Sequence, residues 1–585
     1  MSDQRAQELI DLGNKLFAKK EPLNSLMQEI ALQFYPVRAT FTMAGDYLGR
    51  DHADHLHDSY PVLVRRELGN AISATLRPRD QRWFHASTLD DERDAEPSNA
   101  QYLEYITQTM RTSIYDMRAK FVRATKEGDQ DFITFGQTVI SVEESPDRAH
   151  LYYRANHLRD CAWLENDIGE VDHLHRKDRM SARNMVRRFG EKKCHKTVVD
   201  ASRKEPGQEF NIRCVMMPSD EYDYAGADSY AGGSKGKGKR HPFIMCYIDA
   251  DNGKMLAEAP SPDFIFCVPR WQTLPGLQYA VSPCTSTALP DGRISQAMAL
   301  MIQEAGEKMI DPPIAADGEV FREFNLQSGA LTWADLAGDR KITDAFAPIN
   351  INGDMRTAFA MRADLRDMLA KAFFIDKLAL PEATDKMTAT EIRARLEEHV
   401  RNLLPLFEPM EHEYNGRLLD KTFFRMRLMK KFDTSMMPDD LSGADISWGF
   451  KNPLQEASTR ILAAQFREAM EIEAGASQVG VPAPRVNFAL ARDDAVRGIG
   501  IPAKWRRTEE EMAAEAEAKA KAAAEQRLVQ QAAAATQIAG QAGDAAQSMQ
   551  AAGLLPAPGA GGPQSDVQEL PDEPEIEYTD FEEVA

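Results

Sequence analysis

The sequence predicts an α+β protein that is predominantly helical. Apolar residues recur at helical spacing in long segments near the N-terminus and again after residue 288. Between residues 132 and 287, short runs rich in Val, Ile, Tyr and Thr replace that pattern and indicate β-strands. At 585 residues the chain is too long for one hydrophobic core, so we expect several domains.

The first half of the chain combines the two patterns. Helical periodicity covers residues 6–20, 62–76 and 99–117. From residue 132 onward the strand-like runs are "TVISVEE", "HLYYRAN", "CAWLEND", "VDHLHRK", "FNIRCVMM" and "PFIMCYID". One short helix, "SARNMVRRFG", interrupts them and ends at Gly190, a typical helix stop. A long loop rich in Gly, Ser and Lys joins the last two runs.

The second half is predicted to be dominated by long helices. A helix over 288–310 stops at Asp311-Pro312-Pro313, residues 311–352 are turn-rich and partly β-like, and a second helix covers 353–374. A charged, Pro-containing segment over 375–388 precedes a helix over 389–430.

That last helix has clear start and break signals. Thr388 and Glu391 have the spacing of a capping box, in which each side chain bonds a free backbone amide of the first turn. Pro405 and Pro409 should kink the helix. A further amphipathic helix is predicted over 454–475.

The C-terminal part has a biased composition. Residues 508–550 are rich in Ala, Glu and Gln, so they favour a helix, but they hold few large apolar side chains and need partners to stabilise it. The last twenty residues hold nine Asp or Glu and no Lys or Arg, so residues 551–585 are predicted to form a disordered acidic tail.

Composition limits the classes of function. The formal net charge of −21 argues against tight DNA binding over a broad surface, but it permits a surface that DNA passes without being held. No run approaches the roughly 20 apolar residues that span a bilayer, and the first residues lack the order of a secretory signal. The six scattered cysteines are typical of reduced thiols in a cytosol.

Three motifs resemble phosphate-binding or metal-binding sites only in part. "GSKGKGKR" (233–240) nearly matches a phosphate-binding loop, but Arg240 stands where Ser or Thr should hold magnesium, so a basic hairpin loop is favoured. His52, His55 and His57 lack a fixed metal-ligand spacing and are typical of a solvated loop. His173 and His175 share one face of a predicted strand and are interpreted as structural residues.

We therefore expect no enzyme activity, no metal and no cofactor, because no nucleophile motif or carboxylate pair stands out. The enzymatic alternative is a nucleotide-driven DNA translocase that uses "GSKGKGKR". It predicts ATP turnover that disappears on Lys239→Ala.

Several segments together resemble a known family. "SPCTSTALPDGRISQAMALMIQEAGEKMIDPPI" and "MTATEIRARLEEHVRNLLPLFEPMEHEYNGRLLDKTF" are similar to the portal proteins, or head-to-tail connectors, of T7-like short-tailed bacteriophages. Upstream, "DFITFGQTVISVEE" and "WLENDIGEVDHLHRKDRMSARNMVRRFG" continue the likeness, and "NPLQEASTRILAAQFREAMEI" does so downstream. The resemblance covers roughly residues 5–500.

The resemblance implies a portal fold: a ring of identical subunits, typically twelve, around a central channel. Its parts would be a wing (1–287, β-rich over 132–287), stem helices (288–310 and 353–374), a clip (311–352), a tunnel loop (375–388), a long kinked wing helix (389–430), a wing and crown segment (431–507), an Ala-rich crown or barrel helix (508–550) and the acidic tail (551–585).

The implied function is passive and mechanical. The ring would sit at one capsid vertex, with assembly in the host cytoplasm, and double-stranded DNA would pass through it during packaging and ejection. Lys377 and Lys386 in the tunnel loop, with Lys371 just before it, are the expected channel-facing cations, and Thr388 with Glu391 would cap the helix behind the loop. Expected partners are the terminase large subunit, which would hydrolyse the ATP, the major capsid and scaffolding proteins, and the tail-adaptor and internal core proteins; no membrane is expected.

One structural alternative remains open at this point. The chain could be another non-enzymatic virion protein, such as an internal core or tail-adaptor component, because such proteins share its helical and acidic character. A ring with a central channel in electron micrographs separates the two hypotheses.

Overall fold

A computed structural model describes residues 2–43, 49, 51–79, 81–90, 93–94, 96–145, 147–221, 241–317, 320, 333, 335, 341, 346–348, 355–378, 410–450, 466–472, 492, 515, 517–524 and 526–527. The chain separates into two compact units, Met1–Arg506 and Arg507–Ala585. In the second unit, the described residues are helical and lie within the segment predicted to form an Ala-rich helix.

The N-terminal part of the first unit is helical, as predicted. Its α-helices are α1 (Ser2–Phe34), α2 (Tyr60–Leu76), α4 (Pro97–Ile114) and α5 (Phe121–Phe135), and short 3-10 turns occupy Pro36–Arg38 and Met117–Ala119. The predicted change to strands at residue 132 is wrong by a few residues. Helix α5 continues to Phe135, and Gly136 ends it with a positive φ of 77°.

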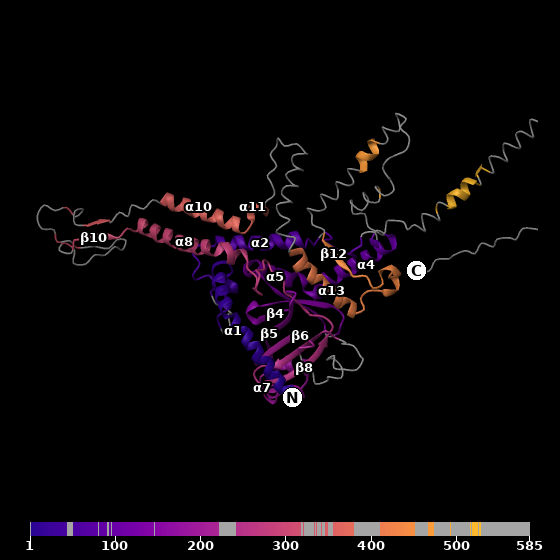
Figure 1. Cartoon of the computed structure of the whole chain (residues 1–585). Helices are drawn as coiled ribbons and strands as arrows, with labels where there is room; N and C mark the ends of the chain where they lie inside the picture. The colour runs from indigo at the N-terminus through magenta and orange to yellow at the C-terminus, as the bar shows by residue number, and fades with distance from the viewer. Residues whose placement is uncertain are drawn as a thin grey trace, which may run out of the picture. The chain divides into compact units, whose positions relative to one another are not determined.

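Two antiparallel sheets follow (Figure 1). The order of the first is β3-β2-β9 and that of the second β4-β5-β6-β7-β8. Their strands are β2 (Val139–Glu144), β3 (Leu151–Asn156), β4 (Cys161–Glu165), β5 (Val171–Ser181), β6 (Glu209–Pro218), β7 (Phe243–Asp249), β8 (Lys254–Ser261) and β9 (Phe266–Cys267). All six strand-like runs of the sequence are confirmed as strands; β8 and β9 were not predicted.

Two short helices connect β5 to β6. Helix α6 (Ala182–Phe189) is the predicted one and ends at Gly190, whose φ is 85°. Helix α7 (Lys196–Lys204) was not predicted. Its buried side includes only Val198 and Ala201, which is too little apolar periodicity to recognise in a sequence.

Helix α1 packs against the five-stranded sheet. Its first turns place Ala6, Leu9 and Ile10 in a small core with residues of β6, β7 and β8. Further along, Lys20 is buried and its Nζ donates to the carbonyl oxygens of Leu158 and Cys161, at 2.5 and 2.7 Å. These bonds fasten α1 to the start of β4, because Cys161 is the first residue of that strand and Leu158 lies in the turn just before it. A buried ammonium must keep its acceptors.

Residues after position 410 return to the N-terminal part. A π-helical segment, Glu411–Gly416, leads into α13 (Arg417–Leu428), and β12 (Ser447–Phe450) pairs antiparallel with β1 (Phe84–Ser87). Residues 389–409, including Pro405 and Pro409, lie outside the described residues. The π-helical turns that begin two residues after Pro409 are nevertheless the kind of irregularity at which helices bend.

The second half of the unit contains a pair of long helices. A π-helical segment, Cys284–Ala288, leads into α8 (Leu289–Ile310), and α10 (Met355–Ala372) lies beside α8 (Figure 1). Between them, β10 (Ile314–Ala316) pairs antiparallel with β11 (Phe346–Pro348), consistent with the partly β-like character predicted for 311–352. Among the described residues, no helix combines the length and apolar character needed to cross a bilayer.

Candidate functional site: the α8–α10 helix pair

One buried carboxylate, Asp58, joins both long helices to the N-terminal part. Ser295 Oγ of α8 donates to Asp58 Oδ2 at 2.8 Å, and Arg366 Nη2 of α10 donates to Oδ1 at 2.9 Å. The backbone amide of Tyr60, the first residue of α2, also donates to Oδ1 at 3.0 Å. Asp58 therefore connects the beginnings of α2 and α8 with the middle of α10.

Gln296 reinforces this junction by bonding the backbone around Asp58. Its Oε1 accepts from the amides of His57 and Asp58 at 2.7 and 2.8 Å, and its Nε2 donates to the Asp58 carbonyl at 2.7 Å. We call Asp58, Ser295, Gln296 and Arg366 the Asp58 cluster. A side chain that makes three such bonds fixes the position of α8 relative to residues 57–58.

The hydrogen bonds keep Asp58 ionised. Burial alone raises the pKa of this carboxyl, but the bonds from Tyr60 N, Arg366 and Ser295 favour the charged form and outweigh it. The pKa of Asp58 consequently lies below its usual value.

Aromatic side chains hold the C-terminal end of α10. Phe373 is fully buried, with its ring centroid 5.6 Å from that of Phe34 at the end of α1. A Cβ on Gly292 of α8 would come within 2.8 Å of Phe34 Cζ, so only glycine allows this close packing. Phe374 has a positive φ of 56° and stacks on Trp271 at 6.5 Å, which turns the chain out of α10.

Two of the predicted channel residues lie directly around this turn. Lys371 is exposed in the last turn of α10, where a cation interacts favourably with the helix dipole. Lys377 is exposed in α11 (Ile375–Leu378), with Nζ 5.6 Å from the Phe374 ring centroid. The predicted loop over 375–388 thus begins with a short helix. Lys386, Thr388 and Glu391 lie outside the described residues.

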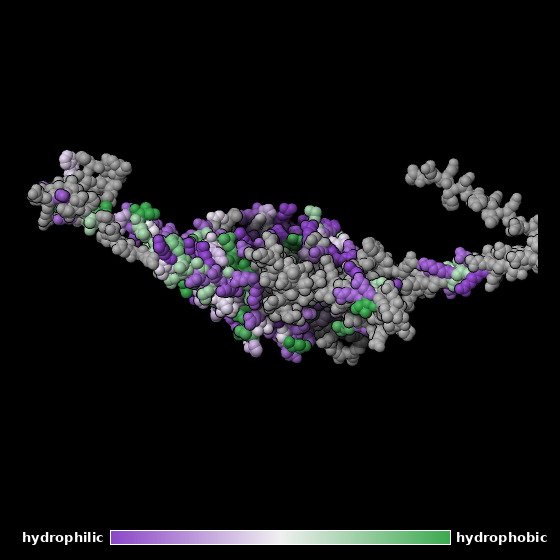
Figure 2. All heavy atoms as spheres, turned by 90° about the horizontal axis from the view of Figure 1, so that it is seen from above, coloured by the Kyte–Doolittle hydropathy of each residue, from purple (hydrophilic) through white to green (hydrophobic). Residues whose placement is uncertain are grey.

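The helix pair exposes an unusual amount of apolar surface. Only the first turns of α8 are buried, and Met301 and Ile310 further along are 67% and 88% exposed. Figure 2 shows hydrophobic side chains along this part of the molecule. The exposed large apolar residues of the two helices are Ile294, Leu300, Met301, Met309, Ile310, Phe359, Met361 and Met368. A face of this kind marks an interaction surface.

The histidines at positions 55 and 57 make contacts within the chain. The backbone of His57 bonds Gln296, and His55 Nδ1 lies 2.6 Å from Asp54 Oδ1. No group of three or more His, Cys, Asp or Glu side chains with metal-binding geometry occurs within the described residues.

His173 and His175 lie on one face of β5, as predicted. Their Nε2 atoms are 3.0 Å apart and the rings stack. Burial lowers the pKa of His173 to about 4 and that of His175 to about 3, so both rings are neutral at neutral pH and one can donate to the other.

The segment "GSKGKGKR" lies outside the described residues, but its flanks do not resemble those of a P-loop. Strands β6 and β7 on either side pair antiparallel, with Pro218 opposite Phe243. After Arg240 the chain enters β7, whereas a P-loop leads into a helix.

Comparison with known proteins identifies the family. The sequence pattern of the family described as "Bacteriophage head to tail connecting protein" matches residues 6–506. The chain belongs to this family. Connector, or portal, proteins are structural proteins of the phage virion, in general without enzyme activity, and they form oligomeric rings.

Two relatives of the connector family are similar over most of their length. The "Probable portal protein" of Bordetella phage BPP-1 is 24% identical over 477 residues, which cover 79% of this chain and 81% of that protein. The "Portal protein" of Salmonella phage epsilon15 is 23% identical over 417 residues, which cover 68% and 70%.

Two solved structures were matched at low similarity. They are the "Virion of native gene transfer agent (GTA) particle" (TM-score 0.31, 10% identity, 79% of this chain and 99% of that chain) and the "Neck of empty GTA particle" (TM-score 0.34, 10% identity, 80% and 98%). At these scores the likeness carries no argument about the fold, which here rests on the structure itself.

The Asp58 cluster was missed by sequence reasoning. Asp58 lies more than two hundred residues before the other members, since Ser295 and Asp58 are 237 residues apart and Arg366 and Asp58 are 308 apart. One signal was present: adjacent polar residues, Ser295 and Gln296, interrupt an otherwise apolar stretch of a predicted helix. Polar residues inside an apolar stripe indicate a buried partner.

Proposed function

We propose that this chain forms the ring-shaped portal at one capsid vertex of a T7-like short-tailed phage, through which double-stranded DNA is packaged, retained and ejected. The observation that carries the proposal is the family match over residues 6–506, together with a long helix pair held to the body at one end. In this proposal α8 and α10 are the stem, residues 311–352 the clip and residues 375–388 the tunnel loop.

The exposed apolar face of α8 and α10 supports ring formation through this pair. Side chains such as Met301, Met309 and Met361 are exposed in the single chain, and a second copy of the chain would remove them from water. Head-to-tail contacts between copies close into a ring when the rotation between neighbours divides a full turn. Twelve copies is the number expected from the family resemblance.

The lysines near the turn after α10 support the position of the channel. Lys371 and Lys377 are exposed, and a ring multiplies each by its number of subunits. A conduit must hold DNA weakly, because neutralising many phosphates would make every step of translocation costly through counterion recapture. A few cations on a chain of net charge −21 meet that condition. Terminase, capsid, scaffolding, adaptor and core proteins are the proposed partners.

Electron microscopy of the assembled protein tests the proposal, because it shows ring symmetry and channel together.

The channel assignment is tested by Lys377→Glu with Lys386→Glu in a packaging assay. Rings are expected to form normally, while the length of packaged DNA or genome retention changes. Lys192→Glu with Lys193→Glu, an exposed pair between α6 and α7, is the matched control. Unchanged packaged length and infectivity in the first variant contradict the assignment.

A further inference from the structure

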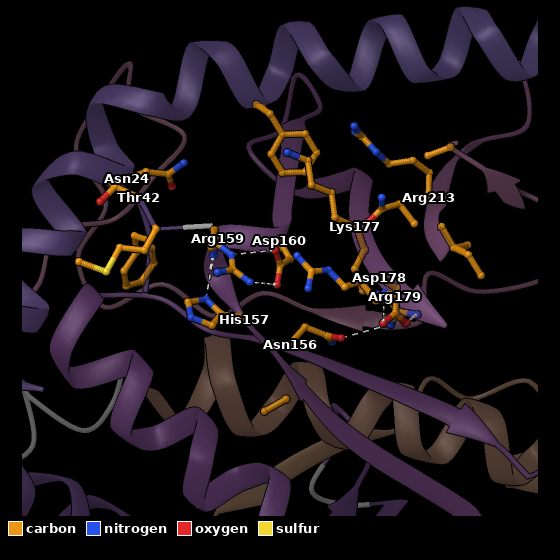
Figure 3. A pocket seen from close by; sticks show the side chains of 18 of the residues that line it. Asn24, Thr42, Asn156, His157, Arg159, Asp160, Lys177, Asp178, Arg179 and Arg213 are labelled. Carbon is orange, nitrogen blue, oxygen red and sulfur yellow. Dashed lines mark hydrogen bonds and ion pairs between the residues drawn. The ribbon is translucent and has the colours of Figure 1, made fainter. Parts of the chain in front are cut away.

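A polar cleft of about 860 Å³ lies where α1 crosses the inner strands of the five-stranded sheet (Figure 3). Seven of the described residues that line it are Lys or Arg and four are Asp or Glu. This positive excess contrasts with the net charge of −21 for the whole chain. The lining of the cleft is therefore positively charged in a protein that is negatively charged overall.

Several of these cations are already neutralised within the chain. Arg38 donates to Asp131, Arg159 to Asp160 and Arg154 to Asp178. Figure 3 shows the paired side chains of Arg159 and Asp160. Each guanidinium in these pairs has a carboxylate to neutralise it.

Three cations of the lining have no carboxylate partner among the described residues: Lys177, Arg179 and Arg213. Lys177 on β5 lies directly opposite Arg213 on β6, and Arg179 follows two residues later on the same face of β5. Like charges opposite each other on neighbouring strands are destabilising. The strands hold the charges together, so an anion that bound there would relieve their repulsion.

Helix α1 fixes two of these side chains. Lys177 Nζ lies 3.9 Å and Arg213 Cζ 5.0 Å from the centroid of the Phe17 ring. Arg213 is buried and its Nη2 donates to Asn14 Oδ1 at 2.7 Å, whereas Lys177 and Arg179 are exposed. Partial desolvation of the Lys177 ammonium lowers its pKa, and the positive charge of Arg213 lowers it further.

The sheet is open beside the exposed cations. Strand β4 pairs with β5 only as far as Cys161 opposite Arg176, so among the described residues no strand pairs with Lys177–Ser181 on that side. A ligand can consequently approach Lys177 and Arg179 along this edge without displacing a strand.

We propose that this cleft binds a phosphate-bearing polyanion, which Lys177 and Arg179 contact directly while Arg213 adds positive charge from behind. A carboxylate offers two coplanar oxygens that suit a single guanidinium. The three cations without a carboxylate partner come from two strands. A ligand with several charged oxygens, or with a repeated charge, matches them better than a single carboxylate does. The ligand is either free polyphosphate or the backbone of a nucleic acid. The proposal is independent of the channel assignment.

The test uses the full-length chain and measures two ligands. Tripolyphosphate binding is measured by calorimetry, and binding of a short fluorescent oligonucleotide, single-stranded and duplex, by anisotropy. We expect Lys177→Gln with Arg179→Gln to weaken binding by about tenfold or more. Lys192→Gln with Lys193→Gln removes the same charge elsewhere and should change binding by less than about twofold. For the oligonucleotide, the slope of log affinity against log salt should fall by roughly 2.

The two ligands separate the two sources. Tripolyphosphate binding without oligonucleotide binding supports free polyphosphate, and the reverse supports nucleic acid. A synthetic peptide of residues 566–585 serves as the competing class of ligand, an acidic peptide. Binding of that peptide alone overturns the proposal, as does an equal loss in both double variants or no phosphate binding below roughly 1 mM. Thermal unfolding and near-ultraviolet circular dichroism of both variants verify that they are folded.

Discussion

At the scale of single residues, buried polar side chains decide where the helices attach. Asp58 receives bonds from α2, α8 and α10, and Lys20 ties α1 to β4. Such groups are stable only when all partners are present, since a buried polar atom without a partner costs about 1–3 kcal/mol. Their removal therefore has consequences larger than the bond that is lost.

Asp58→Ala is expected to lower the free energy of unfolding by roughly 2–3 kcal/mol, because Ser295 and the Tyr60 amide lose their acceptor. Urea unfolding followed by tryptophan fluorescence measures it. Arg366→Gln is the control, since it leaves the buried bonds from Ser295 and the Tyr60 amide in place. It removes the part-exposed ion pair and the contact of Arg366 with the Tyr60 ring, and it should cost about 1 kcal/mol or less. Equal effects of the two variants would show that the buried bonds do not contribute as described.

Buried histidines should make the protein sensitive to acid. Burial, with the charges of Arg38 and Arg159, lowers the pKa of His157 from 6.5 to about 2. Below pH 6.5 the unfolded chain takes up a proton that the folded chain does not. As the pH falls below 6.5, the free energy of unfolding consequently decreases by about 1.4 kcal/mol per pH unit for each such histidine.

His157→Asn tests this, because Asn does not titrate and its Oδ1 can replace Nδ1 as acceptor for the Arg159 amide. Urea unfolding at pH 7.0 and at lower values down to about 4.5 should give a shallower pH dependence for the variant. His173 and His175 continue to titrate in both proteins. An unchanged slope would mean that His157 is not buried in its neutral form.

At the scale of elements, helices α8 and α10 carry an apolar face that the single chain leaves exposed. Met301→Glu is expected to shift assembly toward smaller species, raising the concentration needed for rings by about tenfold or more. Analytical ultracentrifugation measures the shift. Gln303→Glu adds the same charge at a polar, exposed position of α8 and should have a small effect.

The elements also show what a sequence can predict. Periodicity over many residues predicted α8 as 288–310 and the structure has Leu289–Ile310, because the pattern of a long helix is local. Six of the eight strands of the two large sheets were predicted for the same reason, whereas β8 and β9 were not. By contrast, β1 and β12 have four residues each, and their pairing depends on contacts between distant segments.

For the candidate sites too, local patterns could be predicted from the sequence and contacts between distant segments could not. Lys371 and Lys377 could be named because a helix end and a charged segment are visible in the sequence, yet their place at the channel stays a prediction. The Asp58 cluster and the polar cleft beneath α1 could not be predicted from the sequence. Each is assembled from elements far apart in the chain, and no spacing of residue types encodes their meeting.

At the scale of the whole molecule, a buried network joins the N-terminal helices to the segment after residue 410. Arg77, just after α2, donates to Asp129 of α5, and its Nη1 donates to Asn415 Oδ1 at 2.8 Å. The Arg77 guanidinium also lies 4.8 Å from the Tyr414 ring centroid. Removing one partner of a buried ion pair leaves an uncompensated charge.

Asp129→Ala is therefore expected to cost about 3–5 kcal/mol. Hydrogen exchange should also increase in Glu411–Gly416 and α13, because the network no longer holds them. Mass spectrometry of deuterium uptake measures this change. Arg123→Gln, on the exposed face of α5, should leave both quantities nearly unchanged. Faster exchange confined to α5 in Asp129→Ala would contradict the coupling.

The pairing of β1 with β12 has a consequence for the order of events during synthesis. The two strands join residues 360 apart, such as Ser87 and Ser447. At about 5–20 residues per second, β1 leaves the ribosome roughly 20–70 s before its partner exists. Among the described residues, β1 is the first strand and β12 the last, so the first strand cannot pair until the last has been made. A nascent chain therefore cannot finish folding before most of it has been translated. A product truncated before β12 leaves β1 without its partner strand.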